Sequence, residues 1–371
     1  MLRLTEPSSM RSVAAALVRR RAGVPGRQAC SHATPRTLLR GPLHKLAPLL
    51  RFAAFGVTAL SAFGCNSAPP NAPVSAATPS ARSQTSIRAD AAPPASQSGG
   101  FDGAAAYDFT AKLVAFGPRP PGSAAIHKTQ DYIRSELQGF GCTVEEDSFN
   151  AQTPIGTLSM KNIVAKIPGT GPGILLLLTH YDTKRLDNFV GAEDAGSSTG
   201  LMLEMARLLC GGPKQRNAVW IAFLDGEETQ ASFEWSNVDS LYGSRELAAR
   251  LAVSGDLKRV RAVILADMIG QKNLHVLRET GSSKWLTDLV WHTAARLGYG
   301  DIFLAQESEV TDDHEPFIRR GVSAIDIIDL SDYTNLGYWH TTEDTLDKIS
   351  PRSLAIVGHV ILESVNELQK R

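Results

Sequence analysis

Short apolar runs recur along the chain from about residue 101 onward, and a polar or glycine-containing turn closes each of them. The clearest examples are residues 173–178 and 219–224, and residues 260–265 and 325–330 are apolar apart from one or two charged positions. An apolar run without alternation is typical of a strand buried on both faces, as in parallel sheets that helices cover on each side. We therefore predict a buried strand at each of these positions.

Segments with other periodicities lie between these runs. Residues 143–149 alternate between apolar and polar positions, which predicts an edge strand, and residues 159–167 and 274–277 predict two further strands. Strands that alternate with helices along a chain are typical of an α/β domain. We expect a single domain with a mixed, mostly parallel central sheet flanked by helices. Helical patterns cover 104–116, 123–137, a segment that ends near Leu209, 244–253, 284–297 and 350–368.

The first hundred residues lack the composition of a folded domain. Residues 1–51 are rich in arginine and poor in acids, and an apolar stretch at 52–63 leads to Cys65. This order is typical of a secretory signal of the lipoprotein type, although Ala-Phe-Gly before the cysteine is an imperfect lipobox. We interpret 1–65 as an export leader with a lipidated Cys65, 66–100 as a disordered linker rich in Ala, Pro and Ser, and 101–371 as the folded domain.

Two alternatives to a lipoprotein remain at this stage. The arginine-rich, acid-poor start also fits an organellar transit peptide, and the apolar stretch could act as an uncleaved anchor. We expect an exported protein of the cell envelope or periplasm.

The charge of the chain excludes some classes of partner. The 371 residues include 38 Lys+Arg and 38 Asp+Glu, so the formal net charge is +0. A balanced chain has no electrostatic reason to bind nucleic acid or an anionic membrane surface. We expect no nucleic-acid partner, membrane contact only through the N-terminal anchor, and a monomer.

Two of the four cysteines fall in the predicted domain. Cys142 lies in a predicted turn between a helix and a strand, and Cys210 closes a predicted helix. They could pair, but their spacing does not require it, and the chain has no Cys-x-x-Cys motif for a metal or redox site. We interpret both as structural thiols.

Histidines and carboxylates follow the predicted strands at the points where the strands end. The ends of parallel strands meet at one edge of a sheet, so these side chains are expected to converge there. Two histidines and several carboxylates suit zinc, which binds through His nitrogen and Asp or Glu oxygen. Each residue alone has a simpler explanation, such as a helix cap or a turn, but their coincidence predicts a metal site. The residues are His180, Asp194, Glu227, Glu228, Asp267 and His340.

Short segments of the globular part share their sequence and order with known enzymes. They are residues 117–123, 152–156, 180–184, 191–194, 223–228, 235–245, 312–322 and 339–341. These segments resemble the zinc-dependent glutaminyl cyclases (glutaminyl-peptide cyclotransferases) and their relatives, the dizinc aminopeptidases. Segments 235–245 and 312–314 are closer to the cyclases. The resemblance covers nearly all of the globular part and implies the α/β/α sandwich of the zinc aminopeptidase-like fold.

The resemblance also implies roles for the converging residues. Asp194, Glu228 and His340 would be the ligands of one zinc ion, and Glu227 would be the general acid/base. The implied reaction is attack of a peptide's N-terminal amine on its own glutamine side-chain amide, which gives pyroglutamate and ammonia. Substrates would be peptide or protein N-termini.

Four further residues take supporting roles in the same comparison. Asp267 and Asp312 would complete a carboxylate network around Glu227 and raise its pKa towards neutrality, as like charges do. Trp235 and Trp339 would line the substrate pocket, for which the alternative is ordinary core packing.

An aminopeptidase would use the same residues differently. Two zinc ions would then share Asp194, His180 and Asp267 would hold the second ion, and Glu227 would activate water. All of these ligand types are present, so the residues alone leave the metal count open. We expect one zinc ion and cyclase activity, with the dizinc aminopeptidase as the alternative.

The chain departs from the animal cyclases in several places. The link between Glu228 and Trp235 is slightly longer, Thr311 replaces a longer amide side chain, and residues 332–338 form this chain's own loop before Trp339. The cysteine pair of some animal members is absent near His180. Substrate preference therefore cannot be carried over.

Overall fold

The computed structural model describes residues 90–232, 234–330 and 337–371. Cys65 and the rest of the interpreted leader lie outside these residues, so the lipobox and export interpretations stay predictions. No helix in the described part of the chain has both the length and the apolar character to cross a membrane.

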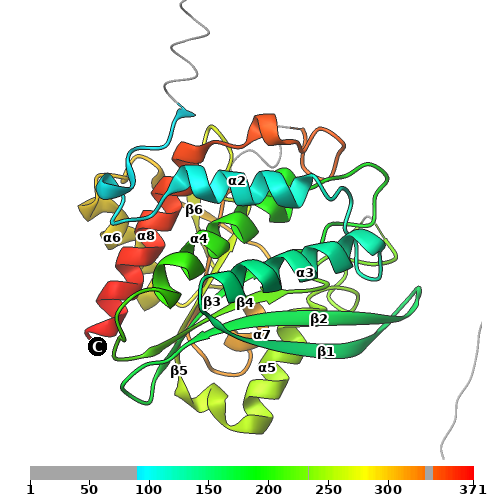
Figure 1. Ribbon diagram of the computed structural model, residues 1–371, viewed down its shortest axis with the longest axis horizontal. Helices are drawn as coiled ribbons and strands as arrows, with labels where there is room; N and C mark the ends of the chain where they lie inside the picture. The colour runs from blue at the N-terminus through cyan, green and yellow to red at the C-terminus, as the bar shows by residue number, and fades with distance from the viewer. Residues whose placement is uncertain (1–89, 233, 331–336) are drawn as a thin grey trace, which may run out of the picture. The chain divides into compact units, whose positions relative to one another are not determined.

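A six-stranded sheet forms the centre of the domain (Figure 1). The last four strands in its spatial order run parallel, and the first two are joined to each other and to the third in antiparallel fashion. The mixed, mostly parallel sheet predicted from the sequence is confirmed. The order across the sheet is β1 (Thr143–Thr153), β2 (Gly156–Ile167), β4 (Ala218–Leu224), β3 (Ile174–His180), β5 (Val260–Asp267) and β8 (Ala324–Ile328).

Helices cover both faces of this sheet, which gives the α/β/α sandwich (Figure 1). Alternate residues of one strand enter different cores: Leu175 and Leu177 pack with one set of helices, and Leu176 and Leu178 with the other. This division explains why β3 is apolar from Ile174 to Leu178. The first face carries α2 (Gly103–Val114), α3 (Ala124–Gly139), α4 (Ser198–Cys210), α6 (Lys284–Arg296) and α8 (Pro351–Gln369), and the second carries α5 (Tyr242–Ser254) and α7 (Glu315–Ile318).

A small parallel pair lies beside the main sheet. It joins β6 (Val276–Glu279) to β7 (Phe303–Ser308). The sequence pattern did not predict β7 or the short helix α7. Most side chains of β7 are exposed or half-buried, so the strand lacks the apolar run or clean alternation that makes a buried strand recognisable.

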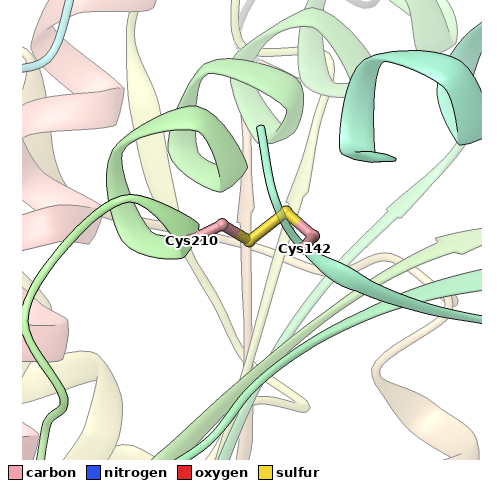
Figure 2. Close-up of a disulfide and its surroundings, with 2 residues drawn as sticks. All are labelled: Cys142 and Cys210. Atoms are coloured by element: carbon pink, nitrogen blue, oxygen red, sulfur yellow. A yellow bond between two sulfur atoms is a disulfide. The ribbon is translucent and has the colours of Figure 1, made fainter. Parts of the chain in front are cut away.

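The two cysteines of the domain form a disulfide (Figure 2). Cys142 immediately precedes β1, Cys210 is the last residue of α4, and their Cα atoms are 5.1 Å apart across a sequence separation of 68 residues. The interpretation of both as structural thiols was therefore wrong, and the pairing that their spacing left open does form. The pairing depends on how α3 and α4 pack together, which local spacing does not reveal.

The folded part also begins earlier than residue 101. The Ser350 hydroxyl donates to the Asp90 carbonyl at 3.2 Å, and a 3₁₀ turn, η1 (Ala95–Gln97), follows. The Phe101 ring packs so closely on Gly358 of α8 that a Cβ there would lie 2.4 Å from it. Residues 90–100, which we assigned to the linker, thus pack on the domain.

Candidate active site

The carboxyl ends of the parallel strands deliver the predicted residues to one edge of the sheet. His180 is the last residue of β3 and Asp267 is the last residue of β5. The pairing of Leu178 with Leu265, continued by two residues, places His180 opposite Asp267. β4 ends at Leu224, so the Glu227 and Glu228 carboxylates follow from the neighbouring strand. The edge lies where α4 and α5 leave on opposite faces, the usual position of a ligand site in such sheets.

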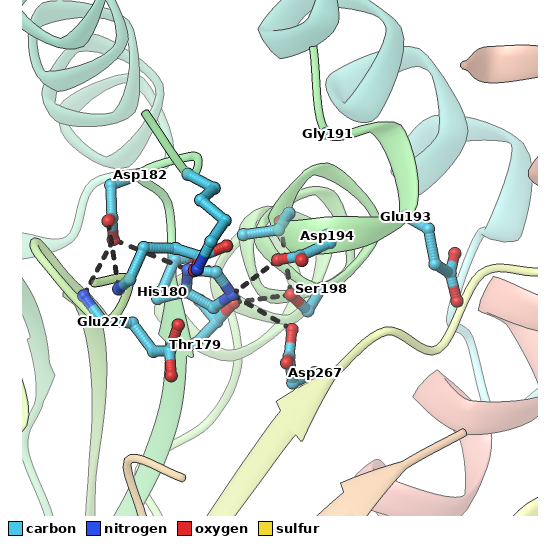
Figure 3. Close-up of polar contacts among 12 residues, drawn as sticks. Thr179, His180, Asp182, Gly191, Glu193, Asp194, Ser198, Glu227 and Asp267 are labelled. Carbon is cyan, nitrogen blue, oxygen red and sulfur yellow. Dashed lines mark hydrogen bonds and ion pairs between the residues drawn. The ribbon is translucent and has the colours of Figure 1, made fainter. Parts of the chain in front are cut away.

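Asp194 reaches this edge from an irregular turn, η2 (Ala192–Ser197), at the start of α4. The backbone N–H groups of Glu193 and Asp194 donate to the Asp344 carboxylate at 2.8 and 3.2 Å. The Asp194 side chain does not cap α4, whose N-cap is Ser197. It points towards His180 instead (Figure 3), so the simpler capping explanation does not apply.

Three of the predicted ligands meet at one point. The His340 Nε2 atom lies 3.1 Å from Asp194 Oδ2 and 2.9 Å from Glu228 Oε1. All three residues are buried, and one ligand atom from each lies within 4.8 Å of the others. His340 has a φ of 52°, a left-handed conformation that is uncommon outside glycine and occurs at functional sites.

The chemistry of this triad fits zinc. Donor atoms about 2.0–2.1 Å from a tetrahedral zinc ion lie roughly 3.3 Å from one another, and the distances of 2.9 and 3.1 Å are close to that spacing. One nitrogen and two carboxylate ligands also match the composition of catalytic zinc sites, which keep a fourth position open. Burial lowers the pKa of His340, but the carboxylates of Glu228 and Asp194 outweigh it and raise the pKa to about 9. A cation bound here would therefore displace a proton.

A second ligand set adjoins the first through Asp194. The His180 Nε2 atom lies 3.3 Å from Asp194 Oδ1 and 3.2 Å from Asp267 Oδ1 (Figure 3). These three side chains also satisfy the spacing of a metal site. Burial raises the pKa of Asp194, but hydrogen bonds from His180 and His340 outweigh it and hold the pKa below its usual range.

Glu227 lies beside both sets without belonging to either. Its side chain is buried, with 7% of the residue exposed, and it lines the same cavity as the ligands. Its backbone N–H donates to Asp182 Oδ1 at 3.1 Å, and the Glu228 N–H donates to Asp182 Oδ2 at 3.4 Å. Asp182 therefore fixes the turn that carries the two glutamates, and Figure 3 shows dashed lines from its carboxylate to both Glu227 and His180.

The surroundings of Glu227 favour its protonated form. Burial, and then the charges of Glu228 and Asp312, raise the pKa of Glu227 well above its ordinary value, while His180 opposes the shift. Burial and the charge of Asp267 likewise raise the pKa of Asp312 well above normal. Acids with raised pKa values can hold and return protons near neutral pH.

A cavity of about 420 Å³ opens over these groups. The Trp339 ring stacks on His340 with centroids 3.5 Å apart and forms part of the wall. Trp235, at 41% exposure, stands at the rim, and its indole N–H donates to Asn237. Thr311, one of the departures from the animal cyclases, also lines the cavity. All the predicted site residues except His180 line this cavity, namely Asp194, Glu227, Glu228, Trp235, Asp267, Asp312, Trp339 and His340.

Several supporting residues were not predicted from the sequence. The Lys184 Nζ atom donates to Glu228 Oε2 at 3.1 Å and to the Thr229 hydroxyl at 2.7 Å. Arg119 is fully buried, and its guanidinium donates to the carbonyls of Tyr181, Val190 and Gly191. The sequence held one indication of these residues, because each is a basic residue within a segment that resembles the cyclases. Arg119 lies in Gly-Pro-Arg-Pro-Pro-Gly and Lys184 in His-Tyr-Asp-Thr-Lys.

The site occupies the part of the chain that a known family describes. The model of peptidase family M28 matches residues 162–365, which is more than half of the chain. The chain belongs to peptidase family M28. The match begins in β2, ends in α8 and contains every predicted ligand and Glu227.

Similar M28-like proteins carry more specific names. A glutaminyl-peptide cyclotransferase of Bothrops jararaca is 31% identical over 291 residues, which cover 67% of this chain and 78% of the relative. A glutaminyl cyclase of an Acidobacteriales bacterium has a TM-score of 0.69 and 41% identity, and the match covers 73% of this chain and 96% of that one. A protein of Parabacteroides distasonis described as a Zn-dependent exopeptidase has a TM-score of 0.64 and 29% identity, covering 71% and 97%.

Proposed function

We propose that this chain is a zinc-dependent glutaminyl-peptide cyclotransferase, which converts the N-terminal glutamine of a peptide to pyroglutamate and releases ammonia. The observation that carries the proposal is the position of Glu227. It lies buried in the wall of a cavity that also contains the Asp194–Glu228–His340 triad. The similarity to a glutaminyl-peptide cyclotransferase of Bothrops jararaca and to a glutaminyl cyclase of an Acidobacteriales bacterium supports the same activity.

In the proposed enzyme, Asp194, Glu228 and His340 hold one zinc ion. Zinc bound there supplies Lewis-acid polarisation of the glutamine side-chain carbonyl. The Lys184 ammonium, 3.1 Å from Glu228 Oε2, orients that ligand and balances part of its charge. Trp339, stacked on His340, offers a flat apolar surface to the glutamine side chain and keeps water from the reacting carbon.

Glu227 moves the protons of the reaction. The substrate's α-amine forms a bond to its own side-chain carbon, and the bond from that carbon to the amide nitrogen breaks. The Glu227 carboxylate accepts the proton that the α-amine loses and returns it to the departing nitrogen, which leaves as ammonia. No proton is gained or lost overall. A carboxyl group whose pKa lies above its normal range suits both halves of this transfer.

The aminopeptidase alternative has its own supporting observation, because His180, Asp194 and Asp267 satisfy the spacing of a second metal site. The two reactions give different products and are expected to differ in zinc content. We expect the purified protein to release ammonia and pyroglutamyl peptide from Gln-Ala-amide with about one zinc per chain. Release of free amino acids from aminoacyl p-nitroanilides, with about two zincs and no pyroglutamate, would reject the cyclase and support the aminopeptidase.

Export to an oxidising compartment is part of the proposal. The Cys142–Cys210 disulfide supports it, since such bonds persist outside the reducing cytosol. A leader ending at Cys65 would provide a lipid anchor. The test is fractionation of cells that express the full chain: Cys65→Ser should move the protein from membranes to the soluble exported fraction. An unchanged membrane fraction would count against lipidation.

A further inference from the structure

One wall of the cavity runs from the solvent to the catalytic groups along a single short segment. Ser308 ends β7 and residues 309–312 follow it, and all five of these residues line the cavity. Glu309 is exposed, the next two residues are half-buried, and Asp312 is buried. Since each residue spans at most about 3.6 Å, Glu309 lies within about 11 Å of the Asp312 backbone. The segment therefore places Glu309 at the rim.

The charge of the rim is negative. Among the described residues that line the cavity, Lys184 is the only lysine or arginine, and it is buried against Glu228. The other lining carboxylates are buried within the site. Glu309 is exposed and lines the cavity, so its carboxylate is accessible to solvent at the entrance.

We infer that Glu309 selects among substrates by the charge of the residue that follows the N-terminal glutamine, favouring lysine or arginine and disfavouring aspartate or glutamate. The inference rests on the proposed function, which places the glutamine inside the cavity. The next residue begins about 3.6 Å further out, and the side chain of lysine or arginine extends several ångströms beyond that. A basic side chain at this position therefore reaches Glu309.

The effect is modest because the carboxylate is exposed. Exposed ion pairs change an equilibrium by about two- to fivefold, and like charges act by similar amounts in the opposite sense. When a basic peptide is compared with an acidic one, the attraction of the first to Glu309 and the repulsion of the second both contribute to the difference in kcat/KM. The ratio of their kcat/KM values should therefore depend on Glu309 by about fourfold or more at low salt.

The test compares Gln-Lys-amide, Gln-Ala-amide and Gln-Glu-amide with the zinc-loaded full chain. Glu309→Gln removes the charge and keeps the side chain's size. Glu307→Gln is the matched control, because Glu307 is exposed near the end of β7, two residues before Glu309, and does not line the cavity. The measurement is kcat/KM at about 20 mM and 500 mM salt, since salt screens exposed charges.

The inference predicts that the lysine-to-glutamate ratio falls about fourfold or more in Glu309→Gln, stays unchanged in Glu307→Gln, and falls in the wild type at high salt. Equal ratios in the wild type and Glu309→Gln would overturn it while cyclisation of all three peptides leaves the proposed function intact. If none of the peptides yields pyroglutamate, the proposed function fails and this inference fails with it.

Discussion

Replacing Glu227 with glutamine isolates proton transfer from metal binding. The substitution keeps the shape of the side chain, and the backbone N–H bond to Asp182 does not depend on it. Burial and the neighbouring charges raise the pKa of Glu227, so a neutral amide resembles the form that the folded protein favours. Glu227 is also absent from both ligand sets. We therefore expect Glu227→Gln to fold normally and to retain zinc.

The expected loss of activity follows from the role of Glu227 as both the base and the acid of the reaction. General acid–base catalysis by one positioned group contributes about 10²- to 10⁴-fold to a rate, which corresponds to about 2.7–5.4 kcal/mol of transition-state free energy. Glutamine can neither accept the proton of the α-amine nor supply one to the departing nitrogen. Because the glutamine substrate still meets the same pocket and ligands, the loss should fall mainly on kcat.

The assay measures ammonia and pyroglutamyl peptide from Gln-Ala-amide, alongside zinc content and the thermal midpoint of unfolding. Glu307→Gln, an exposed carboxylate outside the cavity, is the control for a lost negative charge. Activity within a few-fold of wild type, with zinc intact, would refute the assignment of Glu227 as the proton carrier. Loss of zinc together with activity would mean that Glu227 is a ligand instead.

Three further changes test other parts of the structure. His340→Ala should abolish zinc binding and activity together, because it removes the nitrogen ligand at the centre of the triad; zinc retained at wild-type stoichiometry would contradict this. Replacing both Cys142 and Cys210 with alanine should lower the free energy of unfolding by about 2–4 kcal/mol, because the disulfide closes a long loop. The value of kcat should stay unchanged, since neither residue lines the cavity. An unchanged urea midpoint would contradict this prediction. Burial and the charge of Asp182 raise the pKa of Asp225 to about 8, so between about pH 4 and 8 the folded state holds a proton that the unfolded state loses, and stability falls as pH rises. Asp225→Asn should remove up to about 1.4 kcal/mol per pH unit of that slope in urea titrations at several pH values; parallel stability curves for the two proteins would rule the effect out.

The central strands and their ends could be predicted from sequence because burial on both faces dictates their composition. β3 is apolar from Ile174 to Leu178 and β4 at every position, and their ends are marked by His180 and by Asp225-Gly226. Once the strands are placed in a parallel sheet, their final residues must share an edge. Most of the candidate site follows from the strand ends in this way, and the resemblance to cyclases implies the roles of its residues.

What escaped prediction lacks such a local signature. The strand β7 is exposed along most of its length, and the Cys142–Cys210 bond joins elements 68 residues apart. Both depend on contacts between distant segments. Residues 90–100 are a similar case: their composition resembles that of a linker, but the structure packs them on the domain through contacts with Lys272, Ser350 and α8.

Buried polar side chains help to position the loops of the site. The Arg119 guanidinium donates to Tyr181 at one end of the loop between β3 and η2, and to Val190 and Gly191 at the other. Asp344 then accepts the N–H groups of the turn that carries Asp194.

Burying these charges is costly unless every polar atom finds a partner, and here the partners are backbone groups that would otherwise lack one. Burial lowers the pKa of Arg119 to about 10, which still leaves it charged at neutral pH. Arg119 and Asp344 thus fix the backbone, and the fixed backbone holds Asp194 where His180 and His340 both reach it. The position of the proposed metal ligand Asp194 therefore depends on residues outside the predicted ligand sets. A motif made up of the metal-binding side chains alone does not include them.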